Sequence, residues 1–414
     1  MKVTNIAVLG YGTVGSGVVE VINTNQEIIN KKTGDEVNVK YVLDLRDFPN
    51  DPVQKKITHN IDDILNDESI KVVVEVMGGT KPAYDFVKAA LLKGKSVCTS
   101  NKELVAKYGA ELIAIAEKKN VNFLFEASVG GGIPIIRPLN QSLTADEIQE
   151  ISGILNGTTN FILTKMSQEG REFEDVLKQA QENGYAERNP AADIEGLDAG
   201  RKIAILSSLA FGLQVDFEDI NIEGITKITK KDMVYAKFMN KEIKLIGSSK
   251  KMGDNIFARV APTFIGSDNQ LSTVHDVYNA IMVKGNMVGT IMFYGKGAGK
   301  LATASAVVAD VIDAIKHKHT NIVQFWAPEK VKVTSSDKEP VAMFVRVAYN
   351  DIEAVKNKVA ELFGIKDIIK LEQFEDEFAF ITEIQPEGEL KEKLKQLESD
   401  VNVKEIRSSI KYEK

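Results

Sequence analysis

This chain of 414 residues has few of the features that mark secreted, metal-binding or membrane proteins. Its single cysteine, Cys98, excludes an internal disulfide and fits a reducing compartment. It has only four histidines, and none has the spacing of a zinc ligand relative to that cysteine. No apolar run is long enough to cross a bilayer, and the N-terminus does not resemble a signal peptide. We therefore expect a cytoplasmic, globular protein with no membrane partner.

An excess of positive charge is also lacking. The 52 Lys and Arg residues are outnumbered by 59 Asp and Glu, which gives a formal net charge of -7 at pH 7. This balance argues against a nucleic-acid partner. The hydrophobic fraction of 43% and the charged fraction of 27% are typical of soluble globular proteins. The length is sufficient for two or three domains.

The chain begins with a short apolar strand, a glycine-rich turn and a helical pattern. The strand is expected at Asn5–Leu9 and the helix from about Thr13 to Ile22. Glycines in such a turn let the backbone approach a pyrophosphate, and the helix N-terminus favours the anion. The candidate nucleotide contacts are Gly10, Gly12, Thr13, Val14 and Gly15. Strands and helices alternate from here to residue 126, which predicts a doubly wound parallel sheet.

The α/β pattern predicts three domains and one connecting segment. These are a Rossmann-type dinucleotide-binding domain at 1–128, a mixed α/β domain at 129–303, a helix returning to the first domain with a linker at 304–333, and a ferredoxin-like βαββαβ domain at 334–414. In the second domain we expect strands at 150–155, 255–260, 273–283 and 289–293. In the last domain we expect strands at 342–349, 368–375, 377–383 and 401–408, and helices at 352–362 and 388–397.

The segment 184–202, GYAERNPAADIEGLDAGRK, concentrates charge of both signs. Its first half is rich in Gly, Asn, Pro and Ala and should be loop. A helical pattern starts near Leu197 and places Asp198 and Lys202 one turn apart on the same face. Such a cluster could hold a zwitterionic small molecule and move a proton. The alternative is a solvated helix start with an ordinary ion pair.

Several segments together resemble the homoserine dehydrogenase family. They are GYGTVGSG, TSNKELVA, EASVGGGIPII, GILNGTTNFIL, GYAERNPAADIEGLDAGRK and YGKGAGKLATASAV. The last domain resembles the ACT regulatory domain found in many such enzymes. The resemblance implies NAD(P)-dependent interconversion of L-homoserine and L-aspartate 4-semialdehyde, on the route to threonine, methionine and isoleucine. It also implies that the domain at 129–303 binds substrate and mediates dimerisation, in a homodimer or homotetramer, with L-threonine as a candidate effector.

The resemblance assigns roles to the charged segment. Lys202 matches the general acid/base, with Lys102 and Asp193 as supporting catalytic residues. Glu187 and Asp198 would hold the substrate ammonium group, beside Gly184. A free lysine has a pKa of about 10.4, so a lysine base needs burial or a nearby positive charge. Asp198 must then bind mainly the substrate amine.

The cofactor assignment stays open between NADP and NAD. The resemblance adds Arg46, Ser100, Lys102 and Gly299 to the nucleotide contacts. An acidic residue after the second strand usually binds the ribose diol of NAD, whereas arginine accommodates the phosphate of NADP. This chain has both Asp44 and Arg46 there, and we favour NADP through Arg46.

The resemblance also implies a monovalent cation site. Glu126, Val129, Gly131 and Ile133 match the sodium-binding positions, and oxygen ligands at alternate residues suit a hard cation. The alternative is that the GGGIP run is only a hinge.

Two positions depart from the family pattern. Ala302 replaces the usual proline after the YGKGAG run, and the turn Tyr349–Ile352 lacks the glycine expected where an effector docks. We therefore expect weak sensitivity to threonine. Two alternative functions have different requirements. An aldehyde-oxidising dehydrogenase would need Cys98 as its thiolate nucleophile, and a non-catalytic amino-acid sensor would not need Lys202.

Overall fold

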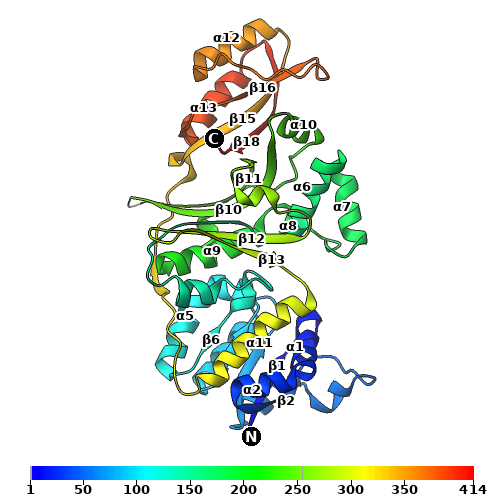
Figure 1. Cartoon of the computed structure of the whole chain (residues 1–414), viewed down its shortest axis with the longest axis vertical. Helices are drawn as coiled ribbons and strands as arrows, with labels where there is room; N and C mark the ends of the chain where they lie inside the picture. Colours follow the sequence, from blue (N-terminus) through cyan, green and yellow to red (C-terminus); the bar gives the residue numbers. More distant parts are fainter. Residues whose placement is uncertain (1, 254) are drawn as a thin grey trace. The chain divides into compact units, whose positions relative to one another are not determined.

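The computed structural model describes residues 2–253 and 255–414 (Figure 1). These residues form two compact units, each assembled from separate stretches of chain. The first unit contains residues up to Ile151, Arg201–Asp219 and Asn279–Val331; the second contains Ser152–Gly200, Ile220–Tyr278 and Lys332–Lys414. Within the described residues, no helix combines the length and the apolar character that a bilayer span requires.

A parallel sheet forms the centre of the first unit. Its strand order is β3-β2-β1-β4-β5-β6. The strands are β1 (Lys2–Leu9), β2 (Asp35–Leu43), β3 (Ile57–Thr58), β4 (Ile70–Glu75), β5 (Ser96–Thr99) and β6 (Phe123–Leu124). Every neighbouring pair is parallel. The prediction of a doubly wound parallel sheet is confirmed, and the strand order reverses between β1 and β4.

Helices cover this sheet. They are α1 (Thr13–Thr24), α2 (Gln26–Thr33), α3 (Asp62–Leu65), α4 (Ala83–Leu92), α5 (Lys102–Lys119) and α11 (Lys300–Lys316). Figure 1 shows α11 alongside α1. Gly17 permits this approach, because a Cβ there would lie 2.9 Å from the Lys300 carbonyl oxygen. Val307 and Val311 of α11 share one core with Ile6 and Val8 of β1. A helix distant in sequence therefore completes the nucleotide-binding unit.

The first unit has two further strand pairs: β12 (Tyr278–Gly285) with β13 (Gly289–Lys296), and β8 (Leu213–Gln214) with β14 (Ala327–Lys330). Three elements contribute residues to both units: β7 (Ile148–Ile154), α9 (Leu197–Phe211) and β12, whose first residue belongs to the second unit.

The second unit has a mixed sheet whose order includes β10-β11-β18-β15-β16. The strands are β10 (Lys241–Met252), β11 (Asn255–Gly266), β15 (Pro340–Tyr349), β16 (Glu377–Ile381) and β18 (Val403–Tyr412), with the short β9 (Asn221–Ile222) beside β11 and β17 (Gln385–Pro386) beside β15. The helices are α6 (Gly157–Glu169), α7 (Phe173–Glu182), α8 (Ala191–Ile194), α10 (Lys230–Phe238), α12 (Ile352–Phe363) and α13 (Glu387–Glu398). The α/β fold with a mixed second sheet is as predicted.

The prediction of a strand at 368–375 is wrong beyond one residue. Only Ile369 forms a bridge, to Ala379 of β16. The ammonium group of Lys370 donates to the carbonyl oxygens of Phe374 at 2.6 Å and Glu375 at 2.8 Å. These bonds fold the segment back on itself, so it cannot extend along β16. The strand order β18-β15-β16, with this bridge at the edge of β16, is that of a βαββαβ unit in which the second strand is reduced to the bridge residue Ile369.

Three other local predictions need correction. The strand expected at 273–283 starts only at Tyr278, after a 3-10 turn at Gln270–Thr273. Strand β10 was not predicted, because its five lysine and glutamate positions hide the alternation; one of them, Lys244, is fully buried. Helix α10 was not predicted either, although Thr229 and Asp232 form a capping box at its start.

Candidate active site

The turn between β1 and α1 is open to an incoming phosphate. Gly10 has φ +97°, and a Cβ on Gly15 would lie 1.9 Å from the Gly10 carbonyl oxygen. Gly12 precedes α1 and has open space around its would-be Cβ, while Thr13 and Val14 form the first turn. Gly12 and Thr13 are exposed, so the start of this helix faces solvent, as an anion site at a helix N-terminus requires.

Asp44 and Arg46, which follow β2, differ in hydrogen bonding and in exposure to solvent. The Asp44 carboxylate accepts hydrogen bonds from the Tyr11 backbone N–H at 2.8 Å and from Arg46 Nε at 2.9 Å. The Arg46 guanidinium holds the pKa of Asp44 well below its usual range. Only 9% of the Asp44 side chain is exposed, against 61% of Arg46. The carboxylate is thus occupied by the protein, and the guanidinium faces solvent.

Two other segments of the first unit contribute to the predicted nucleotide site. Ser100 follows β5, and Lys102 is the first residue of α5. Gly299 is the N-cap of α11, with φ +125° and open space around it. The contact between Gly17 and Lys300 brings the start of α11 next to α1. The second turn of α1 and the start of α11 are therefore neighbours.

The predicted substrate residues meet around one amide. Asn156, the N-cap of α6, donates from Nδ2 to Asp193 Oδ1 at 2.7 Å and to Asp198 Oδ2 at 2.9 Å. Asp198 and Lys202 are both buried on α9, at 4% and 8% exposure. This burial argues against the solvated ion pair that the charge pattern left open. Sequence reasoning did not select Asn156, although it precedes a helical run in GILNGTTN as an N-cap does.

Glu187 and Gly184 are exposed on the loop after α7. Among the described residues, Glu187 is not part of the hydrogen-bonded group around Asn156; its carbonyl oxygen accepts from Gln181 Nε2 at 3.2 Å. The structure therefore brings together Asp193 and Asp198, and leaves Glu187 on an accessible loop.

The Glu126 carboxylate is engaged by the backbone. It accepts hydrogen bonds from the N–H groups of Ile135, Ile136 and Arg137. Gly131 has φ +58° and packs so closely on Gly297 that a Cβ would lie 2.2 Å from its carbonyl oxygen. No cluster of acidic, histidine or cysteine side chains in the described part of the chain could hold a metal ion. A cation here would depend on backbone carbonyl oxygens.

The thiol of Cys98 is fully buried in β5. Burial raises its pKa well above the usual value. A thiol that stays protonated is a poor nucleophile, which removes the basis for the aldehyde-oxidising alternative.

Comparison with known proteins identifies the family of the chain. Residues 10–126 match the family model described as "Homoserine dehydrogenase, NAD binding domain", and residues 134–312 match "Homoserine dehydrogenase". Homoserine dehydrogenase of Bacillus subtilis is 38% identical over 429 residues, covering 100% of this chain and 99% of the relative. That of Synechocystis is 44% identical over 342 residues, covering 81% of this chain and 75% of the relative.

Solved structures of homoserine dehydrogenases have the same fold as this chain. A homoserine dehydrogenase from Thiobacillus denitrificans superposes with a TM-score of 0.93 at 36% identity, covering 100% of this chain and 99% of that one. A hyperthermophilic archaeal homoserine dehydrogenase mutant in complex with NADPH gives a TM-score of 0.65 at 30% identity, covering 75% and 97%. The fold and its nucleotide domain define an NAD(P)-dependent oxidoreductase. The chain belongs to the homoserine dehydrogenase family.

Proposed function

We propose that Lys202 is the general acid/base for the interconversion of L-homoserine and L-aspartate 4-semialdehyde. In the oxidising direction, the lysine amine takes the hydroxyl proton while the carbon–oxygen single bond becomes a carbonyl. The nicotinamide, when bound, accepts the hydride. The observation that carries this assignment is the burial of Lys202 one helical turn from Asp198, which Asn156 orients.

The carboxylates beside Lys202 supply the site for the substrate ammonium group. One Asn156 amide donates to Asp193 and Asp198 together, which holds two negative groups around a single point. A cation is favoured beside two carboxylates. We assign Asp198 as the principal ligand, with Asp193 in support and Glu187 approaching from its exposed loop with Gly184.

We favour NADP over NAD as the nucleotide. The pyrophosphate would lie over Gly10, Gly12, Thr13, Val14 and Gly15, with Gly299 and Ser100 beside it. Arg46 supports a ribose phosphate, because Asp44 is already hydrogen-bonded within the protein. Lys102, at the start of α5, would lie near the nicotinamide and polarise the substrate oxygen.

Four finer assignments complete the proposal. Sodium would bind the carbonyl oxygens at Glu126, Val129, Gly131 and Ile133, because the Glu126 carboxylate is already occupied by backbone N–H groups. We also propose a homodimer or homotetramer, a cytoplasmic location, and a weak response to threonine.

The direct experiment is a spectrophotometric assay with L-homoserine and either nucleotide, with and without L-threonine. We expect nucleotide reduction that depends on homoserine and prefers NADP. No reduction with either nucleotide, by a folded protein that binds them, would refute the activity.

A further inference from the structure

A carboxylate that the sequence analysis did not select lies at the centre of the nucleotide-binding sheet. Glu75 is the last residue of β4 and is 0% exposed. Its neighbours in the sheet register are Leu9 of β1 and Thr99 of β5. The strand order reverses between β1 and β4. Open α/β sheets bind their ligands at the carboxyl ends of strands next to such a reversal, so Glu75 is buried at the nucleotide edge of the sheet.

Neutral groups hold this carboxylate. The Thr99 hydroxyl donates to Oε2 at 2.6 Å, and the Met77 backbone N–H donates to Oε1 at 2.8 Å. Asn101 Nδ2 lies 3.5 Å from Oε1 and donates to the Gly79 carbonyl oxygen at 2.6 Å. Burial raises the pKa of Glu75 above its usual value, and these hydrogen bonds oppose that shift. An ionised carboxylate accepts at both oxygens, which matches donors on both sides.

The same hydrogen bonds continue into the first turn of α5. The Asn101 backbone N–H donates to the Thr99 hydroxyl oxygen at 2.9 Å, and Asn101 Oδ1 accepts from the Leu104 N–H at 3.1 Å. Asn101 is thus the N-cap of α5. Its backbone N–H contacts Thr99, and its side-chain amide lies next to Glu75. The next residue is Lys102. The position of this lysine therefore depends on the carboxylate.

We propose that Glu75 is a positioning residue for the reaction. Its carboxylate fixes Thr99 and Asn101, these fix the first turn of α5, and that turn holds Lys102 where turnover requires it. The inference rests on the proposed role of Lys102, and the experiments below test the two separately.

The primary test is Glu75→Gln. The amide has the shape of the acid, but only its oxygen accepts, so it cannot receive both the Thr99 hydroxyl and the Met77 N–H as the carboxylate does. We expect kcat to fall by about ten- to a hundredfold, the scale of a misplaced catalytic group. The KM values for homoserine and nucleotide should change much less. An unchanged kcat would overturn the proposal.

A double-variant cycle shows whether Glu75 acts through Lys102. If it does, Glu75→Gln added to Lys102→Ala should cause no further loss, because residues that act as a unit are not additive. Full additivity of the two losses would overturn the proposal. If Lys102→Ala alone keeps wild-type turnover, the assigned role of Lys102 fails, whatever the fate of Glu75.

A matched control separates positioning from stability. Asp232 in the second unit is also 0% exposed and accepts a hydrogen bond from Ser408 at 2.8 Å. We expect Asp232→Asn to lower the thermal midpoint while keeping kcat near the wild-type value. If Glu75→Gln does not fold, Thr99→Val removes the same link with Glu75 intact. It should lower kcat in the same direction, and a wild-type kcat in that variant would overturn the proposal.

Discussion

Glu75 in the first unit and Glu377 in the second are both 0% exposed, yet groups of opposite kinds surround them. Glu75 accepts hydrogen bonds from neutral groups, Thr99 and the Met77 backbone. Glu377 instead faces cations: Arg407 Nη1 lies 3.0 Å from Oε2 and Arg346 Nη1 lies 3.5 Å from Oε1. The hydrogen bonds of Glu75 fix the orientation of its carboxylate without placing a cation beside it. The arginines around Glu377 place positive charge beside its carboxylate and connect elements that are far apart in sequence.

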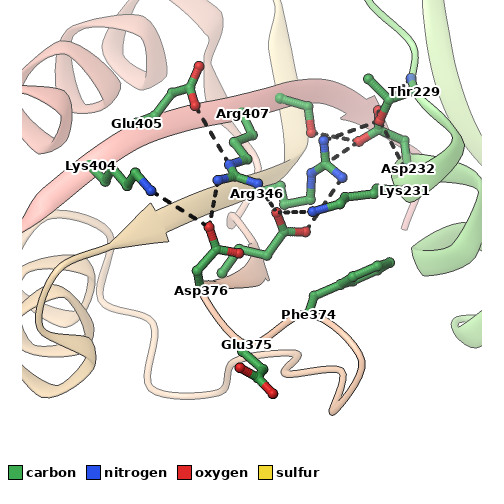
Figure 2. A network of polar contacts seen from close by, with 12 residues as sticks. Thr229, Lys231, Asp232, Arg346, Phe374, Glu375, Asp376, Lys404, Glu405 and Arg407 are labelled. Carbon is green, nitrogen blue, oxygen red and sulfur yellow. Dashed lines mark hydrogen bonds and ion pairs between the residues drawn. The ribbon is translucent and has the colours of Figure 1, made fainter.

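The cationic arrangement connects α10 to the C-terminal strands, as Figure 2 shows. Arg346 of β15 lies 3.5 Å from Asp232 of α10, and its Nη2 donates to the Thr229 hydroxyl at 3.2 Å. Arg407 of β18 is 2.7 Å from Asp376. The ion pairs of Arg346 Nε and Nη1 are 3.5 Å long, which exceeds an ideal hydrogen bond. These two buried atoms therefore have no hydrogen-bond partner in the described part of the chain.

The two groups therefore have different roles: the contacts of Glu75 fix the position of a helix, and the contacts of Glu377 stabilise the fold. A buried charge pair returns little net stability, because desolvation offsets the attraction, but removing one partner is costly. The network around Arg346 should therefore matter for folding and not for turnover. The group around Glu75 should matter for turnover, because it ends at the helix that carries Lys102.

The strongest test of this contrast is Lys202→Ala. We expect turnover to fall by more than about a hundredfold, the usual scale for a positioned acid/base. Nucleotide affinity and the thermal midpoint should be almost unchanged. Steady-state kinetics with a nucleotide titration measures both. Retention of more than about a tenth of the wild-type rate would remove Lys202 from this role.

Arg346→Met should give the opposite result. It leaves Asp232 and Glu377 buried without their shared cation, which should cost about 3–5 kcal/mol of unfolding free energy. Turnover at a temperature where the variant is folded should stay close to wild type. Denaturant unfolding and kcat at low temperature provide the two readings. Arg407→Met is the control, since Arg407 is more exposed and its loss should cost less.

Asp198→Asn and Glu187→Gln test the ammonium site by their ranking. Asp198 is buried and oriented by Asn156, whereas Glu187 is exposed. We expect both variants to raise KM for homoserine far more than KM for the nucleotide, with the larger effect at Asp198. Equal effects on the two KM values would count against a substrate clamp. If neither KM changes, the two carboxylates do not bind the substrate ammonium group.

Arg46→Ala should have a smaller and more selective effect. Loss of the guanidinium should weaken NADP by about tenfold, the scale of one charge-assisted contact, and leave NAD use unchanged or slightly better. The gain is expected because Asp44 loses its partner and becomes available to a ribose diol. The ratio of kcat/KM for the two nucleotides decides the outcome. A proportional loss with both would place Arg46 outside the ribose site.

The two regions also differ in how well sequence predicts them. Most of the nucleotide sheet was predictable because its longer strands contain apolar runs such as VVVE, whereas the two-residue β3 has no such run and was not predicted. In the second unit, β10 carries the buried Lys244 in a lysine-rich run, and the strand expected at 368–375 is folded back by Lys370. Local patterns cannot show that a lysine will be buried or will bind carbonyl oxygens. For the same reason the sequence did not point to Glu75 or Asn156: Thr99 is 24 residues from Glu75, and Asp198 is 42 residues from Asn156.

The smallest effect is expected for threonine. In the turn before α12, Asp351 Oδ1 accepts hydrogen bonds from the N–H groups of Glu353 and Ala354, and the Asn350 N–H donates to the Asn402 carbonyl oxygen at 2.7 Å. The chain's own carboxylate therefore caps the helix end at which an effector carboxylate would dock. An effector acts only through different affinities for two states, so a site that binds threonine poorly gives little inhibition. We expect at most weak inhibition at millimolar threonine and sub-saturating homoserine. Truncation after Lys332 should then cost stability, because β11 loses its partner β18. Inhibition that disappears on truncation would show instead that the C-terminal domain senses threonine.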